Sequence, residues 1–346
     1  MTRRLRAFFA DPSVRPFAVL ALITIILGIV DGSHGRVLSA NTAYSVLQQF
    51  ATIGPIALGL GLSMMVKEFD LSVGGVLSLA GCVAVMTGET NPVLGLLVAT
   101  AVGGLAGLAQ GSIMTWLNLS SIGVTLGGLL TFGGLSYFLT GNNTIAFERV
   151  DVALAVNTPL LEIFSARSLT AILLFLVATF VVSWTRFGRD LLAVGSDRRA
   201  AIVVGIRVDN ILIAVFVISG ALTAVSGGLL SYGLAAASPV ALADTLVPGA
   251  AAAILGGVSL SGGKGRPLGI AGGVLVLSML RSGLTAIGVP PFVHWIVTAG
   301  VLFAVGILDS EELGRRLHSI RRAVNKRRSV FSSNEPIIPI QHQNDR

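Results

Sequence analysis

The sequence predicts an all-α membrane protein, a bundle of about ten transmembrane helices with both termini in the cytoplasm. Two observations predict this fold class. Hydrophobic residues occupy 53% of the 346 positions and charged residues 12%, which is about half the charged fraction of a typical soluble domain. In addition, uncharged apolar runs recur along the chain, and the basic residues gather in the short gaps between them. The mean hydropathy of +0.84 agrees with this composition.

The apolar runs have the length of a membrane span or somewhat less. A straight span needs about 20 residues, so the shorter runs depend on Ser, Gly or Thr flanks. One or two of them are expected to be re-entrant or broken, with about eight spans as the lower count, because free backbone groups at membrane depth must be covered by protein or water. The runs are 17–30, 50–66, 73–86, 93–117, 122–139, 169–184, 211–234, 246–260, 268–280 and 292–308.

Three parts are expected along the chain. Residues 1–16 form a basic cytoplasmic segment, and no small-residue cleavage site follows the first apolar run, so that run is predicted to be an uncleaved helix. Residues 17–310 form the membrane domain. Residues 311–346 are predicted to hold a basic amphipathic helix on the anionic membrane lipid, followed by a disordered tail.

The distribution of Lys and Arg predicts the orientation. With ten spans and a cytoplasmic N-terminus, 20 of the 24 basic residues fall on the cytoplasmic side, as the positive-inside rule requires. The exceptions are Arg36, Arg149, Arg167 and Arg281.

Several classes of protein are disfavoured by what the runs contain. The single Cys82 and four scattered His residues give no disulfide framework and no metal-ligand spacing. Clustered nucleophile groups are missing, so no enzyme activity, catalytic residue or bound cofactor is expected. The net charge of +7 does not indicate nucleic acid, because the basic residues lie between apolar runs. None of the ten runs contains an acidic residue, which argues against an ion-coupled secondary transporter.

Glycines recur at four-residue spacing in two runs, which gives an apolar helix a flat face for close contact. This spacing predicts a packing seam within the subunit, with a dimer seam as the alternative. The glycines are Gly103, Gly107 and Gly111, and then Gly269 and Gly273.

The longest internal gap on the predicted cytoplasmic side, residues 185–210, carries a helix signal. Ser196 or Asp197 can serve as an N-cap, Ala200 and Ala201 favour helix, and Gly205 is suited to end it. A short amphipathic helix outside the membrane is therefore expected. Its apolar face would comprise Ile202, Val203 and Ile206.

The same segment resembles the coupling-loop motif of ABC importer permeases, whose core is Ala-Ala-x-x-x-Gly, here Ala200 to Gly205. Its surroundings are similar to the ribose- and xylose-type monosaccharide permeases. Further family motifs recur in the family's order, so the resemblance covers residues from about 50 to 310. These motif residues are Asp70, Ser72 and Gly74, the loop glycines Gly256, Gly257, Gly262 and Gly263, and Asp309.

The resemblance implies the permease subunit of a sugar importer in the bacterial inner membrane. Its implied partners are cytoplasmic ATPase subunits that use ATP and Mg²⁺, a periplasmic substrate-binding protein, and a second permease copy, identical or not. The residues expected to couple to the ATPase are Asp197, Arg198, Ala200, Ala201 and Gly205. Ala201 and Gly205 are expected to sit in a groove of that ATPase. A permease for a non-sugar solute, such as a nucleoside or a branched-chain amino acid, is the alternative.

Departures and polar residues bear on the solute. The family's Asn-Gly-Leu is Ser282-Gly-Leu here, preceded by Arg281. Glu68 and Asp70 follow a span and are expected at the cytoplasmic interface.

The chain has no Walker A pattern, since Lys264 is followed by Gly265. Candidates for the substrate path are Gln48, Gln49, Gln110 and His294, although interhelical hydrogen bonds are the commoner use of such Gln residues.

Overall fold

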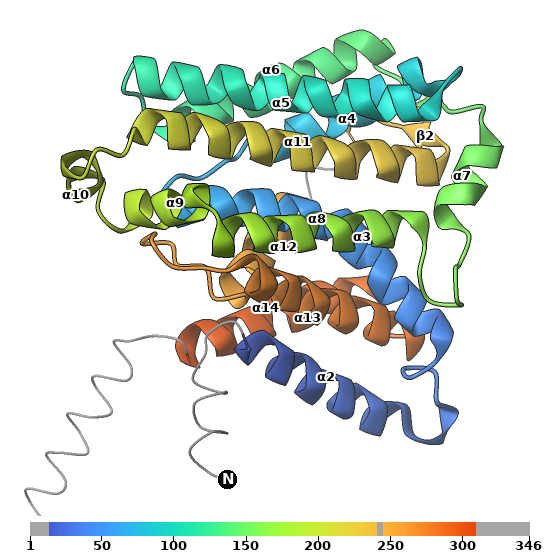
Figure 1. The fold of residues 1–346 in the computed structure, drawn as a ribbon. Helices are drawn as coiled ribbons and strands as arrows, with labels where there is room; N and C mark the ends of the chain where they lie inside the picture. Colours follow the sequence, from blue (N-terminus) through green and yellow to red (C-terminus); the bar gives the residue numbers. More distant parts are fainter. Residues whose placement is uncertain (1–13, 241–244, 309–346) are drawn as a thin grey trace, which may run out of the picture. The chain divides into compact units, whose positions relative to one another are not determined.

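The computed structural model describes residues 14–240 and 245–308 (Figure 1). Asp309 and the expected basic helix and tail lie outside the described residues. The chain divides into two compact units, Met1–Thr298 and Ala299–Arg346. The packing core and all the loops and contacts that follow belong to the first unit. The three-part division of the chain at residues 16 and 310 stays a prediction.

Ten apolar helices correspond to the ten predicted runs in the described part of the chain, which confirms an all-α, multi-pass membrane protein. The cytoplasmic position of both termini stays a prediction. Seven of the helices are long and apolar enough to cross a membrane: α2 (Arg15–Asp31), α3 (Ala40–Met65), α5 (Pro92–Trp116), α6 (Ser121–Thr140), α8 (Ala166–Trp184), α11 (Val208–Leu234) and α13 (Pro267–Ala286). Three others are shorter or less fully described: α4 (Val73–Gly88), α12 (Leu246–Leu255) and α14 (Pro291–Leu308). At 1.5 Å per residue, α12 spans only about 15 Å, about half the thickness of the hydrocarbon core of a bilayer.

The centre of the first unit is built on α3, α11 and α13. α3 packs against α11, α13, α12 and α8, while α11 also packs against α4 and α5. Large apolar side chains such as Ile29 on α2 and Phe138 on α6 are instead largely exposed. Apolar residues exposed over whole helix faces are expected where lipid replaces water as the solvent.

Glycines bring the helices of this core into backbone contact. A Cβ atom at Gly107 of α5 would overlap the Phe216 carbonyl oxygen of α11, and one at Gly103 would overlap the Gly220 carbonyl oxygen. Likewise, a Cβ atom at Gly273 of α13 would overlap the Ala252 carbonyl oxygen of α12. The glycine spacing therefore makes packing seams within the subunit, as predicted.

Short elements connect the spans. α9 (Arg186–Ser196) and α10 (Arg198–Val203) lie between α8 and α11. Where α11 ends, β2 (Ala236–Ala237) pairs antiparallel with β1 (Ile145–Ala146), and α7 (Val150–Asn157) and the single turn η1 (Gly32–His34) also lie in loops. Figure 1 shows α10 beyond one end of α11 and β2 at the other.

Candidate coupling site and transport path

Three loops that are far apart in sequence meet where α3 ends. They are the segment after Met65, the α9–α10 segment and the glycine loop 256–265. The Gly263 N–H donates a hydrogen bond to the Met65 carbonyl oxygen at 2.8 Å. The Lys67 Nζ donates to the Ser196 carbonyl oxygen at 2.9 Å. Each of these loops carries residues that resemble a family motif, and the structure brings all three together in what we call the coupling junction.

Local sequence signals explain the two helices on one side of this junction. The Asp197 carboxylate accepts hydrogen bonds from the backbone N–H groups of Arg199 (2.8 Å) and Ala200 (3.2 Å), which confirms the expected N-cap of α10. α10 ends before Gly205, whose φ of +84° lies in the left-handed region that favours glycine. The preceding helix α9 was not expected. It is capped by the Thr185 hydroxyl, which accepts from the Gly188 N–H.

Glycines make the coupling junction tight. A Cβ atom at Gly195 would overlap the Met65 carbonyl oxygen, and one at Gly263 would overlap the Ser196 hydroxyl. Gly262 and Gly263 also have positive φ angles of +75° and +70°. Because backbone meets backbone here, α9, the end of α3 and the glycine loop cannot move far without moving one another.

A charged pair adds a second link between α10 and the end of α3. The Arg198 guanidinium forms an ion pair with Glu68 and donates to the Val66 carbonyl oxygen at 3.0 Å. Arg198 was expected to face the ATPase. The structure shows that its side chain also fixes α10 to the chain that follows α3.

The exposed face of α10 differs from the expected one. Ala201 is only 2% exposed, so it packs inside this chain and not in a groove of a partner. The exposed apolar residues are Ile202 (62% exposed), Val203 (86%) and Val204 (74%). Asp197, Ala200 and Gly205 are exposed beside them. The register of this short helix follows from its contacts with α9 and α11, which the sequence pattern does not reveal.

Asp70, expected at the cytoplasmic interface, is buried inside the helix bundle. Its carboxylate accepts hydrogen bonds from the Ser72 hydroxyl at 2.6 Å and the Ser219 hydroxyl of α11 at 2.8 Å. Gln110 of α5 donates to the same Ser72 hydroxyl at 2.9 Å. Asp70 and Ser72 thus join the start of α4 to α5 and α11. Gly74, in the first turn of α4, is buried as well.

The two remaining motif glycines shape the start of the glycine loop. A Cβ atom at Gly256 would lie 2.6 Å from the Gly269 carbonyl oxygen of α13. Gly257 has a φ of +84°. A side chain at either position would therefore disturb the contact of α12 with α13 or the turn that follows α12.

A polar cavity of about 680 Å³ lies at the other end of α3. We call it the end pocket. It is lined by residues of the loop before α3, the first turns of α3 and the last turns of α13: His34, Gly35, Arg36, Ser39, Asn41, Thr42, Ser45, Gln49, Arg281, Ser282, Thr285 and Ala286. Its volume falls within the range of about 300–1,000 Å³ that is usual for small-molecule sites.

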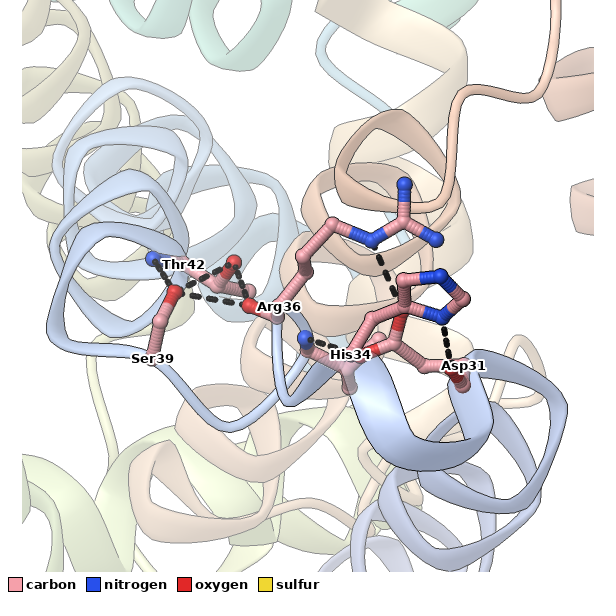
Figure 2. A network of polar contacts seen from close by, with 6 residues as sticks. Asp31, His34, Arg36, Ser39 and Thr42 are labelled. Atoms are coloured by element: carbon pink, nitrogen blue, oxygen red, sulfur yellow. Dashed lines mark hydrogen bonds and ion pairs between the residues drawn. The ribbon is translucent and has the colours of Figure 1, made fainter.

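Figure 2 shows the polar network that fixes the wall of the end pocket. The buried Asp31 carboxylate accepts from the Arg36 Nε at 2.9 Å and from the Val37 N–H at 3.1 Å. The Ser39 hydroxyl caps α3 by accepting from the Thr42 N–H. The loop between α2 and α3 is therefore held by its own hydrogen bonds, and Arg36 stands in a defined position.

The four substrate-path candidates have different surroundings. Gln49 lines the end pocket. Gln48 donates to the Tyr44 hydroxyl, and Gln110 is buried in the Asp70 network. The His294 Nε2 lies 3.0 Å from the Val289 carbonyl oxygen. Arg36 and Arg281 also line the end pocket but were not among the candidates. Their predicted position on the non-cytoplasmic side, against the positive-inside rule, was the sequence signal that could have identified them.

A bundle of apolar helices long enough to cross a membrane defines a multi-pass membrane protein, and the polar cavity at one end could admit a small solute. The chain belongs to the family described as "Branched-chain amino acid transport system / permease component", which it matches over residues 42–306. It is therefore a transport permease of the bacterial inner membrane, a non-enzymatic role.

Known relatives cover most of the chain. The ribose import permease protein RbsC of Bacillus subtilis is 29% identical over 86% of this chain and 92% of that protein. The D-allose transport system permease protein AlsC of Escherichia coli is 29% identical over 85% of this chain and 90% of that protein. The autoinducer 2 import system permease protein LsrC of Yersinia pseudotuberculosis is 30% identical over 90% of this chain and 88% of that protein. No solved structure matches the chain.

Proposed function

We propose that this chain is the membrane permease subunit of an ABC importer that carries a monosaccharide into the cell. The observation that supports it best is the coupling junction, where the segment resembling the coupling loop is joined to the end of the central helix α3. The relatives are named for the import of ribose and of autoinducer 2 and for the transport of D-allose. A permease for another solute of the same family remains the alternative within this class.

The orientation follows from the charge distribution. The α9–α10 end faces the cytoplasm and the end pocket faces the periplasm, since 20 of the 24 basic residues lie in segments assigned to the cytoplasmic side. Both termini are then cytoplasmic. A periplasmic binding protein delivers the solute to the pocket end, and cytoplasmic ATPase subunits meet α10.

The arrangement supports a mechanical link between ATP use and the transport path. Separate ATPase subunits bind ATP and Mg²⁺, and this chain binds neither. When these subunits close, they displace α10. Its ion pair with Glu68, together with the tight glycine contacts of the adjoining α9 and the glycine loop, passes the movement to the end of α3. α3 has 26 residues, so it extends about 39 Å and reaches the end pocket. A second permease copy completes the path.

One observation favours a second candidate. Asp70 is a buried carboxyl group that receives hydrogen bonds only from hydroxyl and N–H groups of described residues. Buried acidic groups are what ion-coupled secondary transporters use to bind H⁺ or Na⁺. The two candidates differ in the source of energy, which can be measured.

The test is reconstitution in liposomes. The purified permease alone is expected to show no ATPase activity and no uptake under an imposed proton or sodium gradient. Uptake of the solute should appear only with the ATPase and the binding protein present and ATP on the ATPase side, and an uncoupler should leave it unchanged while ATP lasts. Gradient-driven uptake by the lone permease that is lost in Asp70→Asn would instead establish the secondary transporter.

A further inference from the structure

The end pocket has a charge that a neutral sugar does not require. Its charged lining residues are Arg36 and Arg281, with His34 beside them, and no Asp or Glu is among the lining residues that the structure describes. The Asp31 carboxylate forms an ion pair with the Arg36 Nε, but Asp31 is buried and is not one of the lining residues. Within the described residues, Arg281 forms no ion pair. Two arginines with one adjacent carboxylate leave a net positive charge at the described lining of the pocket.

The Arg36 guanidinium keeps two nitrogens available, and Arg281 is an exposed residue. The hydrogen bond between Arg36 and Asp31 uses Nε, and Figure 2 shows the two terminal nitrogens of Arg36 extending beyond it. The Arg36 side chain is 48% exposed. Terminal guanidinium nitrogens bind carboxylate and phosphate oxygens in pairs, with stronger hydrogen bonds than neutral donors provide.

Neutral polar groups continue from these arginines along α3. Asn41, Ser45 and Gln49 line the pocket at four-residue spacing, so they share one face of the helix. This stripe extends for about 12 Å. On α13, Ser282 and Thr285 add hydroxyl groups. Hydroxyl and amide groups in a row suit a ligand with several hydroxyl groups.

We propose that the end pocket binds an anionic monosaccharide, a sugar acid or a sugar phosphate, with Arg36 and Arg281 holding its acidic group. This inference rests on the proposed function, since it names the class of solute that the importer carries. The stripe along α3 favours a solute over an acidic side chain of the binding protein, because a docked protein would reach the rim and leave Gln49 without a ligand. Arg281 and Ser282 are also where the chain departs from the family pattern, which fits a different solute.

The test measures protection of a cysteine in the pocket of the purified full-length permease. Ser45→Cys on a Cys82→Ser background is labelled with N-ethylmaleimide, an uncharged reagent whose approach does not depend on the arginines. D-gluconate or D-glucose 6-phosphate at 10 mM is expected to slow labelling at least about threefold. D-glucose, and sodium sulfate at the same ionic strength, should leave the rate nearly unchanged.

Charge variants decide whether the arginines cause the protection. Arg36→Gln and Arg281→Gln should each abolish it, while Arg281→Lys should keep part of it. The matched control is Arg149→Gln. Arg149 is also assigned to the periplasmic side, but it pairs with Asp151 and does not line the pocket. Each variant is first checked for unchanged thermal unfolding. If Arg281→Gln fails this check, Arg36→Gln and Arg281→Lys carry the comparison.

Four results would overturn the proposal. Equal protection by D-glucose would show that charge is not selected, and equal protection by sulfate would show a general anion site. Absence of protection by both anionic sugars, or protection that survives both Arg→Gln changes, would also overturn it. If the sugars do not protect but Arg281→Gln weakens binding of the binding protein, the pocket receives a protein carboxylate instead. Because labelling needs neither ATP nor partners, these results leave the liposome test of the importer untouched.

Discussion

The two ends of α3 are built on opposite principles. At the coupling junction, glycines bring backbone against backbone, and an ion pair and two side-chain bonds to carbonyl groups join loops from three parts of the chain. At the end pocket, polar side chains surround open space, and the hydrogen bonds run within one loop and the first turn of α3.

The coupling junction is therefore suited to transmit movement, and the end pocket is suited to contact the solute. A tight junction is useful where displacement must pass from one element to the next, because close-packed groups transmit strain. An open, hydrated pocket is useful where a polar solute must enter and leave. One helix of about 39 Å connects the two, so a change at either end can be tested for its effect at the other.

The largest expected effect concerns which end faces which compartment. Single cysteines at Thr158, near the pocket end, and Arg199, on α10, are introduced on a Cys82→Ser background. Both positions are exposed. In intact cells, a membrane-impermeant thiol reagent should label Thr158→Cys fully and Arg199→Cys not at all, with Arg199→Cys labelled only after the membrane is opened. Labelling of Arg199→Cys in intact cells would reverse the comparison between the two ends.

The second prediction breaks the coupling junction. Gly195→Ala places a methyl group against the Met65 carbonyl oxygen, an overpacking that costs about 1–3 kcal/mol. Uptake should fall at least about tenfold, and the thermal unfolding temperature in detergent should fall by several degrees.

The matched control for this change is Gly123→Ala. Gly123 is also in a helix, α6, but a Cβ atom added there would have no neighbouring atom within 4 Å, and its φ is not positive. It should keep both uptake and stability. Normal uptake by Gly195→Ala would show that the junction is looser than its geometry indicates.

Sequence patterns predicted the elements of this comparison but not their meeting. The ten helices follow from local composition, since lipid requires apolar runs, and the cap at Asp197 depends on residues two and three positions away. The coupling junction depends on contacts between Met65, Ser196 and Gly263, and no periodicity encodes such a distance along the chain.

Burial was predicted poorly for the same reason. Ala201 was expected in a groove of the ATPase and Asp70 at the cytoplasmic interface, yet both are buried by elements packed from elsewhere. The end pocket shows this again. Arg36 and Arg281 are separated by almost the whole membrane domain, and only the packing of α13 against α3 brings them to one cavity.

The smallest expected effect comes from a change on the exposed face of α10, which tests whether the coupling-junction end of the molecule contacts the ATPase. Val203 is 86% exposed and should contact an apolar part of the ATPase. Val203→Asp would put a charge in that contact without disturbing the coupling junction. Affinity for the ATPase, measured with the purified subunits, should fall about tenfold, which corresponds to about 1.4 kcal/mol.

Stability and membrane insertion of Val203→Asp should not change, because the side chain has few contacts within its own chain. The control is Leu161→Asp, which alters an equally exposed residue, at 87%, in the loop between α7 and α8. It should leave ATPase affinity unchanged, since that loop is assigned to the periplasmic side. If the two variants weaken the ATPase equally, α10 is not the docking element. If only Val203→Asp does so, the exposed apolar residues of α10 provide the docking surface for the ATPase.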